Sequence, residues 1–454
     1  MKKVRIGTGS GYWGDRFDAA DTLAAKGDVD YIAFDYLAEL TMSIMQKQKN
    51  KDPKKGYATD FLTVLKRILP VCKAKNIKLI ASAGGVNPEA LGDEIVALAK
   101  GMGINLKVAL VTGDNIYDRL GEIEKQGCAF SNMENGGSFS KVKDRITNAN
   151  VYLGAEPIVE ALRNGAEVVI TGRNTDTSLF LAPMIYELGW KSTDYDKLAN
   201  GICFGHIIEC GAQVSGGNFT GGWEEVPDLA HLGWPIAEVY EDGTATITKP
   251  DGTGGLVSPA TVKEELLYEI GDPASYITPD VIADFSQVHV EDAGVNKVRV
   301  YGSKGAPPPE TLKVSMGYTD GFKAFGEISY AWPKALKKAR LADSILRERF
   351  KIIGLEAEEI LTEFIGYNSI LGPISEREAS EPEEVRLRIG IRTKTLAEAQ
   401  KLAPELPCLV TCGPPNGSGY NLGKMPPQEI LAYWPALMSK TFVTAVVTYK
   451  ENKV

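Results

Sequence analysis

The chain has 454 residues, of which 44% are hydrophobic and 24% charged, so it is long enough for two or three globular domains. Its 59 acidic residues outnumber its 50 lysines and arginines, and the net charge of −9 argues against nucleic acid or an anionic membrane as a partner. Its apolar runs are shorter than the roughly eighteen residues of a membrane-spanning helix, so none is expected.

The N-terminus and the cysteines predict a cytoplasmic protein. The opening MKKVRIGTGSG has glycines where a signal peptide would have an apolar run, so a strand is expected there. The six cysteines are widely spaced and form no C-x-x-C pair, which favours reduced thiols. The three histidines do not have metal-ligand spacing, so we expect the chemistry to use carboxylates, arginine, lysine, asparagine or cysteine.

The first 190 residues alternate short apolar runs with helical patterns, which is typical of parallel β-α-β units. The apolar runs predict strands at Val4–Thr8, Asp30–Phe34, Ile77–Ala81, Leu106–Val111 and Glu167–Thr171. The helical patterns predict helices at Arg16–Lys26, Leu37–Lys47, Thr59–Lys75, Pro88–Lys100, Asn115–Lys125, Pro157–Arg163 and Thr177–Leu188.

The second half has a different pattern. Residues 205–223 predict an amphipathic helix that ends after Val214, and residues 236–249 predict a hairpin with its turn at Glu241–Thr244. Further antiparallel strands are expected, followed by a helix at Pro333–Arg349 with its proline in the first turn and by a strand and a helix within 383–406. The fold class is therefore α/β: a Rossmann-like parallel sheet flanked by helices (residues 1–230), then an α+β domain with mixed or antiparallel strands (231–454).

Polar residues follow each of the five predicted strands. The carboxyl ends of parallel strands lie on one edge of a sheet, where such folds bind ligands. The candidates are Ser10, Tyr12, Trp13, Asp15 and Arg16; Asp35 and Glu39; Ser82, Gly84, Gly85 and Asn87; Thr112, Asp114 and Asn115; and Arg173, Asn174, Asp176 and Ser178. We therefore predict the active site at this edge.

A glycine motif follows the first strand. Gly9, Gly11 and Gly14 form G-x-G-x-x-G, and Asp35 lies 21 residues after Gly14, near the spacing at which dinucleotide-binding proteins hold the ribose. This pattern is compatible with an NAD(P)-dependent oxidoreductase.

Three neighbouring features argue against a dinucleotide. Asp15 places a carboxylate at the expected helix N-terminus, where a pyrophosphate needs positive potential. Tyr12 and Trp13 are bulky where close backbone approach is needed, and Glu39 adds a second acid. We favour a tight turn with Asp15 as a helix-stabilising acid, or a turn whose N–H groups hold a carboxylate or thioester oxygen.

Two pairs of side chains are candidates for chemistry. Asp35 and Glu39 are four residues apart, which places them on one face of the expected helix. They form either a general acid–base pair or two solvated acids. Arg173 with Asp176 could clamp a substrate carboxylate or form a structural ion pair.

Two further stretches leave alternatives open. His206 lies one helical turn before Cys210 and next to Glu209, which is compatible with an activated thiol or with a buried packing cysteine. KPDGTGGLVS (249–258) precedes a helix expected to begin near Pro259, and forms either an anion site or a plain loop.

The motifs together resemble the acyclic terpene utilisation (AtuA-like) family, in order from residue 5 to about 420. The stretches that carry the resemblance are SGYWGDR, DYLAELTM, SAGGVNP, YLGAEPIVEALRNGAEVVITGRNTDTSL, GHIIECGAQVSGGNF, GTGGLVS, YITPDV, PPPETLKVS and GPPNGSGY. The resemblance implies breakdown of citronellol- and geraniol-type terpenes through acyl-CoA intermediates and argues against a plain dehydrogenase. Many relatives carry an extra small C-terminal domain, so a small partner subunit is expected to replace it here.

The combined expectation is a lyase or hydratase for a small branched carboxylic acid or its acyl-CoA thioester. The alternatives are a non-catalytic acyl-CoA-binding or complex-forming subunit and an NAD(P)-dependent oxidoreductase. A homo-oligomer is expected, a divalent cation stays open and NAD is not expected. The catalytic candidates are Asp15, Asp35, Glu39 and Asp176. The binding candidates are Ser10, Gly11, Gly14, Gly84, Gly85, Asn87, Asp114, Arg173, Gln213, Thr253 and Gly254.

Overall fold

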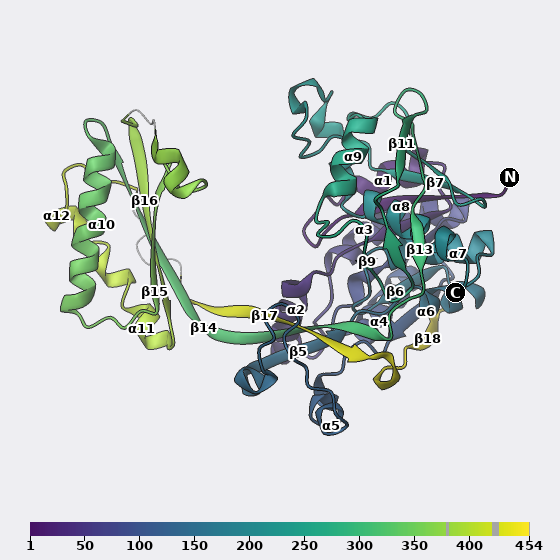
Figure 1. Cartoon of the computed structure of the whole chain (residues 1–454), viewed down its shortest axis with the longest axis horizontal. Helices are drawn as coiled ribbons and strands as arrows, with labels where there is room; N and C mark the ends of the chain where they lie inside the picture. The colour runs from purple at the N-terminus through teal and green to yellow at the C-terminus, as the bar shows by residue number, and fades with distance from the viewer. Residues whose placement is uncertain (378–380, 420–425, 454) are drawn as a thin grey trace. The chain divides into compact units, whose positions relative to one another are not determined.

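The computed structural model describes residues 1–377, 381–419 and 426–453. These residues form two compact units (Figure 1). Unit 1 contains Met1–Gly317 and Tyr433–Val454, and unit 2 contains Tyr318–Ala432. The strands β14 (Thr311–Ala331) and β17 (Gln428–Ser439) each contribute residues to both units.

The centre of unit 1 is the predicted parallel sheet. Its strands lie in the order β1-β2-β3-β6-β4 and pair in parallel, with Ile6 opposite Tyr31 and Leu79 opposite Val168. The bounds are β1 (Lys3–Ser10), β2 (Tyr31–Phe34), β3 (Lys78–Ala81), β4 (Lys107–Thr112) and β6 (Val168–Thr171). All five strands expected from the sequence are therefore confirmed to within a few residues.

Antiparallel strands extend this sheet on both sides, giving a ten-stranded sheet in the described residues. The predicted hairpin is confirmed, since β7 pairs with β8 and also with β1. The added strands are β7 (Ile236–Tyr240), β8 (Ala245–Thr248), β12 (Val298–Tyr301), β11 (His289–Asp292) and, beside β4, β18 (Val446–Glu451). Smaller elements of unit 1 are β5 (Ile146–Val151), β9 (Tyr276–Ile277), β10 (Ile282–Asp284) and β13 (Lys304–Ala306).

Helices cover both faces of the sheet, which is why its strands are apolar in continuous runs. Alternate strand residues contribute to two separate cores: Ile6 and Val169 pack with α6–α8, whereas Phe34 and Leu79 pack with α1, α3 and α4. The helices are α1 (Ala19–Lys26), α2 (Glu39–Lys51), α3 (Asp60–Lys75), α4 (Pro88–Gly101), α5 (Leu120–Lys125), α6 (Glu156–Arg163), α7 (Ser178–Leu188), α8 (Tyr195–Glu209) and α9 (Pro259–Leu267).

Two helices begin later than the sequence predicted. Helix α1 begins at Ala19 rather than at Arg16, so the glycine turn does not open directly into a helix. Helix α2 begins at Glu39 rather than at Leu37. Asp35 therefore lies before α2, and the expectation that Asp35 and Glu39 share a helical face is wrong.

Helix α8 ends earlier than predicted, at Glu209 instead of Val214. Gly211 follows with φ +66°, and a Cβ atom there would meet the Trp234 ring at 2.3 Å. A glycine is needed at this position because the backbone is left-handed and closely packed. The early end leaves Glu209 at the terminus of the helix.

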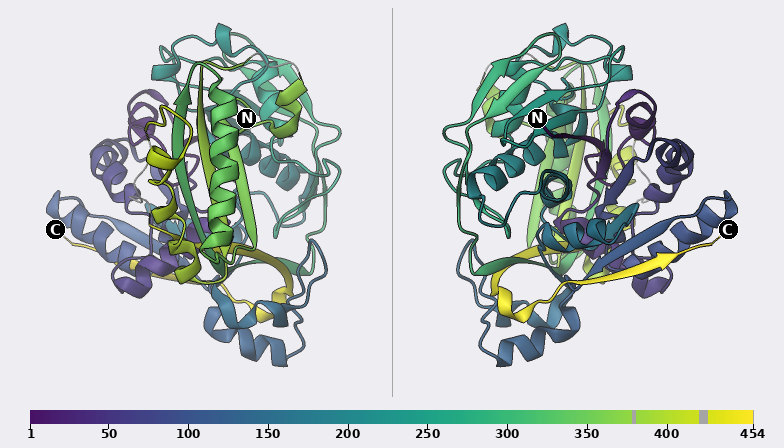
Figure 2. Two further views of the ribbon diagram at one scale, coloured as in Figure 1. Left: turned by 90° about the vertical axis from the view of Figure 1, so that its left-hand side faces the viewer. Right: turned by 90° about the vertical axis from the view of Figure 1, so that its right-hand side faces the viewer.

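Unit 2 is an antiparallel sheet with one long helix, α10 (Ala335–Ile352), lying along its strands (Figure 2, left). The sheet order is β15-β16-β14-β17, with β15 at Glu359–Ile365 and β16 at Glu384–Thr393. Short helices α11 (Leu396–Gln400) and α12 (Leu409–Cys412) follow. The expected helix thus exists, but Pro333 precedes it instead of lying in its first turn.

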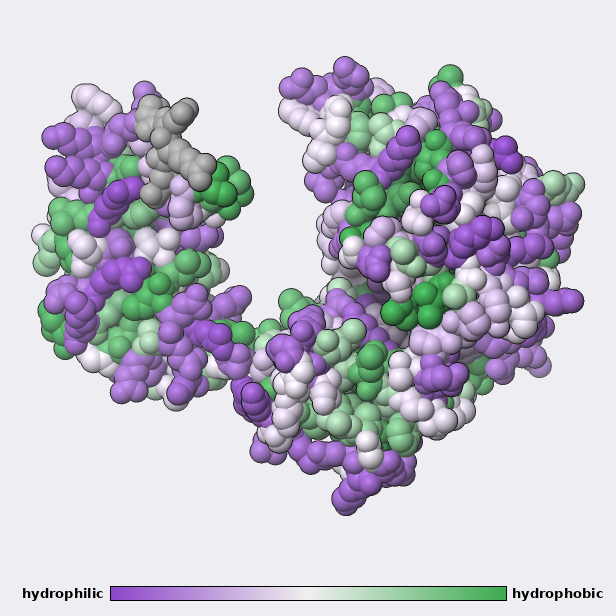
Figure 3. Space-filling model, in the orientation of Figure 1, coloured by the Kyte–Doolittle hydropathy of each residue, from purple (hydrophilic) through white to green (hydrophobic). Residues whose placement is uncertain are grey.

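The surface of the described residues is largely polar. Hydrophilic side chains cover much of the face seen in Figure 3, interrupted by smaller hydrophobic patches. Among the helices of the described residues, none combines the length and the apolar character needed to cross a bilayer.

The glycine motif has a packing role that can be tested. A Cβ atom on Gly9 would lie 2.2 Å from the ring of Phe34, which is fully buried and in edge contact with Phe61. We expect Gly9→Ala to lower the free energy of unfolding by about 1–3 kcal/mol, the usual cost of overpacking. The control is Gly121→Ala in α5, where a Cβ atom meets nothing within 4 Å. Urea or thermal melts measure both, and a Gly9→Ala protein as stable as wild type would contradict this role.

Candidate active site at the carboxyl edge of the sheet

A pocket of about 590 Å³ lies at the carboxyl edge of the parallel sheet. Its walls come from the segments after β1, β2 and β6 and from the end of α8. The lining residues are Gly11, Tyr12, Trp13, Asp35, Tyr36, Leu37, Ala38, Glu39, Thr41, Arg173, Asp176, Glu209, Cys210, Gln213, Tyr268 and Glu269. The pocket is thus bordered by five carboxyl side chains and by one arginine.

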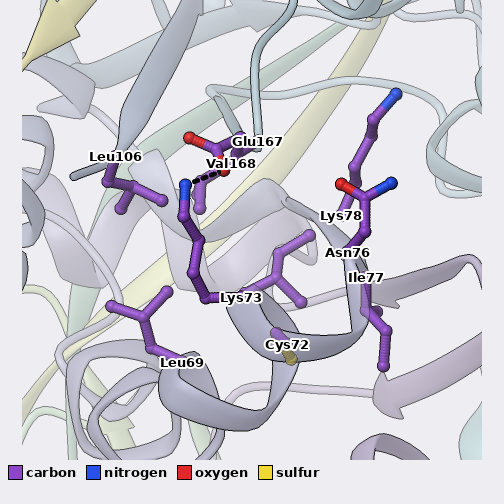
Figure 4. Close-up of a pocket in the computed structure, with 10 residues that line it drawn as sticks. Leu69, Cys72, Lys73, Asn76, Ile77, Lys78, Leu106, Glu167 and Val168 are labelled. Carbon is purple, nitrogen blue, oxygen red and sulfur yellow. Dashed lines mark hydrogen bonds and ion pairs between the residues drawn. The ribbon is translucent and has the colours of Figure 1, made fainter. Parts of the chain in front are cut away.

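A small cavity lies at the opposite edge of the sheet (Figure 4). The cavity there holds only about 10 Å³ and lies among the amino ends of β3, β4 and β6. The Lys73 ammonium group forms an ion pair with Glu167 across it. This cavity is much smaller than the pocket at the carboxyl edge.

Arg173 is the central cation of the pocket, and only 2% of its surface is exposed. Its Nη1 atom donates to the Leu37 carbonyl and, at 2.8 Å, to Asp176 Oδ1. Its Nη2 atom donates to the Tyr152 hydroxyl at 2.9 Å, and the guanidinium carbon lies 4.2 Å from the centre of that ring. The predicted pairing of Arg173 with Asp176 is present. The Arg173 Nε atom is buried and has no hydrogen-bond partner in the described residues.

Glu39 is held in its ionised form. The Tyr152 hydroxyl donates to Glu39 Oε1 at 2.6 Å, Lys313 Nζ lies 3.5 Å from that oxygen, and Arg173 Nη2 lies 3.9 Å from it. Burial raises the pKa of Glu39, but Arg173 and the Tyr152 hydrogen bond outweigh burial and bring this pKa down to about 2. Glu39 is therefore a fixed negative charge at neutral pH.

Asp35 has the opposite character. Ser82 Oγ donates to its Oδ1 atom at 2.9 Å and the Leu37 N–H donates at 3.3 Å, which fixes the carboxyl group at the end of β2. Burial, reinforced by the negative charge of Asp176, raises the pKa of Asp35 well above its usual value although Arg173 opposes this. Asp35 therefore holds its proton at pH values where an ordinary aspartate has lost it.

Glu209 is the second carboxyl group that retains a proton. It is 6% exposed, at the C-terminal end of α8, and its Oε1 atom lies 3.1 Å from His206 Nδ1. Burial raises the pKa of Glu209 well above its usual value, and the charges of Asp176 and Glu269 raise it further. Burial also raises the pKa of Asp176 above its usual value, although the ion pair with Arg173 opposes this.

The pocket thus combines protonated and ionised carboxyl groups. When environments push the pKa values of neighbouring acids apart, one can exchange a proton near neutral pH while another carries a fixed charge. Asp35 and Glu209 belong to the first kind and Glu39 to the second. No group of three or more histidine, cysteine, aspartate and glutamate side chains among the described residues is arranged to hold a metal ion.

The glycine turn is occupied by its own aspartate. Asp15 Oδ2 accepts a hydrogen bond from the Gly11 N–H at 3.0 Å, and Asp15 Oδ1 accepts one from the Arg16 N–H at 2.8 Å. The expectation that Asp15 stabilises the following helix is wrong, because α1 begins only at Ala19. A dinucleotide phosphate would also have to displace this carboxylate from the Gly11 N–H. Gly14 has φ +106° and forms the turn. It is not among the described residues that line the pocket.

Two predicted binding residues, Asn87 and Asp114, form hydrogen bonds within the protein around the pocket. Asn87 Nδ2 donates to the Pro53 and Lys55 carbonyls. Buried Asp114 accepts from the Arg173 N–H and from Asn150 Nδ2, both at 2.8 Å. Each of these contacts fixes a loop near the sheet edge.

Close backbone approach accounts for the glycines of the next loop. A Cβ atom on Gly84 would meet the Thr171 carbonyl oxygen at 2.5 Å, and one on Gly85 would meet Met45 Sδ at 2.4 Å. Ser10 is also buried, and its hydroxyl donates to the Tyr12 carbonyl at 2.9 Å.

The second glycine turn lies outside the pocket lining. The buried Lys249 donates to Thr253 O at 2.8 Å and to Thr253 Oγ1 at 3.2 Å, and Gly254 packs on the Asp228 carbonyl. The helix expected near Pro259 is confirmed as α9. Gln213, by contrast, does line the pocket and accepts a hydrogen bond from Asn218.

The activated-thiol alternative lacks support from the geometry. His206 hydrogen-bonds to Glu209 and not to Cys210. Burial raises the pKa of the Cys210 thiol, so the reactive thiolate is disfavoured.

Sequence reasoning missed part of the site. Glu209 was considered only beside a cysteine, although an acid at the end of the apolar run GHIIE is a usable signal. Tyr152, which follows β5, and the Tyr268–Glu269 pair after α9 had no such signal, because only the folded chain brings them to the pocket region.

The fold and the pocket define an α/β protein with a carboxyl-rich site at the position where open parallel sheets bind ligands. Residues 4–449 match the family model described as acyclic terpene utilisation family protein AtuA, and the chain belongs to this family. The resemblance stated from the sequence motifs is thereby confirmed, although GPPNGSGY ends at Tyr420, outside the described residues. Comparisons with curated proteins and with solved structures gave no match.

The raised pKa of Asp35 predicts a pH effect on stability. Because the folded state holds this proton more tightly than the unfolded state, stability decreases as pH rises above the ordinary aspartate value near 4 and through the folded pKa. We expect Asp35→Asn to show a smaller decrease in melting temperature over this range than wild type. The matched control is Asp118→Asn, at an exposed position. If the melting temperatures of wild type and Asp35→Asn fall by the same amount over this pH range, the raised pKa of Asp35 is contradicted.

Proposed function

We propose that the chain is a catabolic enzyme of the lyase or hydratase type that acts on a branched acyl-CoA thioester or its acid in acyclic terpene breakdown. The family description supports the metabolic setting. The observation that carries the proposal is Asp35, a carboxyl group with raised pKa in the same pocket as the fixed Arg173–Glu39 charges.

Asp35 is the better of the two predicted proton-transfer residues. A base is stronger when its conjugate acid has a higher pKa, so a raised aspartate pKa improves proton abstraction near neutral pH. Glu39 is a weak base, since its pKa is about 2 and its Oε1 atom is engaged by Tyr152 and Lys313. In this proposal Asp35 moves the proton, and Glu39 holds Arg173 and Tyr152 in place.

The charges of the pocket favour a thioester over a free acid. The charge of Arg173 is already shared by Glu39 and Asp176, and an entering carboxylate would lie near several carboxyl groups. A neutral thioester carbonyl avoids this repulsion. The aromatic rings of Tyr12 and Trp13 at the pocket offer apolar surface for a branched hydrocarbon chain.

The reaction class follows from these roles. In a hydration, water adds across a double bond conjugated to the thioester carbonyl, placing hydroxyl on C3 and hydrogen on C2. In the reverse direction, Asp35 removes the C2 proton. This carbon is acidic because the adjacent carbonyl accepts the developing negative charge, which a buried donor stabilises.

Proton transfer by Asp35 predicts solvent exchange at C2. Wild-type protein in D2O should incorporate deuterium at C2 of isovaleryl-CoA, and Asp35→Asn should lower the rate about 10²–10⁴-fold because the base is removed. Mass spectrometry of the recovered thioester measures the exchange. The exposed-site variant Asp118→Asn should match wild type. A wild-type protein that gives no exchange above buffer, or an Asp35→Asn variant that exchanges at the wild-type rate, would rule out the proposal.

The two alternative classes predict different ligand responses. A ligand at 100 times its dissociation constant stabilises the folded state by about 2.7 kcal/mol, which a thermal-shift measurement detects. We expect stabilisation by branched acyl-CoA thioesters and none by NAD or NADP. Stabilisation by a nicotinamide cofactor would favour the oxidoreductase, whereas thioester binding without exchange would favour a non-catalytic subunit.

A further inference from the structure

Two buried polar atoms of the pocket residues have no hydrogen-bond partner in the described part of the chain: Arg173 Nε and Glu209 Oε2. Arg173 is 2% exposed and Glu209 is 6% exposed, and both line the 590 Å³ pocket. Buried polar groups are almost always paired in native proteins. Both residues line the pocket, so a ligand bound there is the candidate source of the missing partners.

The two atoms require different partners. Arginine Nε–H is a donor and never an acceptor, so it requires an acceptor such as a carbonyl oxygen. A protonated glutamic acid donates one hydrogen bond, so Glu209 fits a hydroxyl group, whose oxygen accepts. The ligand that satisfies both atoms has two separate oxygen functions.

Glu209 is held so that, in the described residues, only one of its two carboxyl oxygens has a hydrogen-bond partner. Its Oε1 atom is engaged by His206 Nδ1 at 3.1 Å, and the His206 ring is stacked on Phe285, 6.0 Å between centroids. His206 is itself 2% exposed, so its contact with Glu209 is fixed by packing. The orientation of Glu209 is thus set by His206, which we treat as a positioning residue.

We propose that the substrate is a 3-hydroxyacyl thioester, with its carbonyl oxygen at Arg173 Nε and its hydroxyl group at Glu209 Oε2, and that Glu209 protonates the departing hydroxyl. This inference rests on the proposed function, because Asp35 removes the C2 proton. The C2–H and C3–O bonds break and the C2=C3 double bond forms. Asp35 enters the step as the carboxylate and takes the C2 proton, and the proton from Glu209 leaves in the water molecule. Asp35 then releases its proton to solvent and Glu209 takes one up, which restores both groups.

The structure favours this assignment over a purely structural Glu209. The C-terminal end of a helix carries partial negative charge, so a carboxyl group there is disfavoured when ionised. Burial without a partner for Oε2 adds to that cost. A proton donor at this point is consistent with both features, because the protonated form carries no charge.

The test separates the two carboxyl groups with three thioesters of one carbon skeleton. Isovaleryl-CoA has no hydroxyl group, so its C2 exchange requires Asp35 alone. Interconversion of 3-hydroxyisovaleryl-CoA and 3-methylcrotonyl-CoA requires Glu209 as well. We expect Glu209→Gln to lower the interconversion at least about 100-fold and to lower exchange on isovaleryl-CoA by a clearly smaller factor, because only the interconversion needs the proton donor. A cooperative thermal melt shows that the variant is folded.

The His206 variants give an independent readout. His206→Leu removes the contact with Glu209 and should lower kcat for the interconversion on the order of 10- to 100-fold, with KM little changed. His206→Asn keeps a nitrogen donor near the position of Nδ1 and should restore most of the rate. If Glu209→Gln lacks a cooperative melt, these two variants decide the question, and equal rates in both would overturn the proposal.

The remaining outcomes distinguish the two proposals. Absence of exchange on isovaleryl-CoA in wild type would remove the proposed function itself. Exchange without interconversion of the hydroxylated and unsaturated thioesters would overturn only the substrate assignment. A folded Glu209→Gln protein that loses both activities equally, or neither, would also overturn the role of Glu209.

Discussion

The site depends on the burial of one positive charge. Arg173 is held by an ion pair with Asp176, by the Tyr152 hydroxyl and by the Leu37 carbonyl, and it lies within 3.9 Å of Glu39. A guanidinium group in this environment is costly unless its hydrogen bonds and its charge are matched. The matching partners come from three separate segments, so the charge of Arg173 fixes the relative positions of the loops after β2, β5 and β6.

That constraint also divides the carboxyl groups into two kinds. Glu39 gains electrostatic stabilisation from Arg173 and a hydrogen bond from Tyr152, and together they lower its pKa to about 2. Asp35 and Glu209 share the burial but receive less of that stabilisation, and the neighbouring negative charges raise their pKa values. A single buried cation thus gives one pocket both fixed anions and groups able to exchange a proton.

Much of the frame could be predicted from the sequence because it depends on local pattern. Apolar runs located the parallel strands, and the polar residues after them located Asp35, Glu39, Arg173 and Asp176 at the pocket. Helix ends were less predictable, since the end of α8 depends on the contact of Gly211 with Trp234, a residue distant in sequence. The same holds for Tyr152: its place beside Arg173 depends on tertiary pairing that no local pattern encodes.

The glycine motif illustrates how a local pattern acquires its meaning from tertiary contacts. A Cβ atom on Gly11 would lie 2.8 Å from the Cys210 carbonyl carbon, so the motif allows the end of α8 to approach β1 closely. The hydroxyl group of Thr8, a residue of β1, donates to the Ile208 carbonyl at 2.6 Å and holds the end of α8 close to β1. Glu209 lies between Ile208 and Cys210 in the chain, so its position at the pocket follows from the contacts of Thr8 in β1 and of Gly11 directly after β1. The glycine motif resembles a dinucleotide-binding pattern, but in this fold Gly11 lets the buried Glu209 reach the carboxyl edge of the sheet.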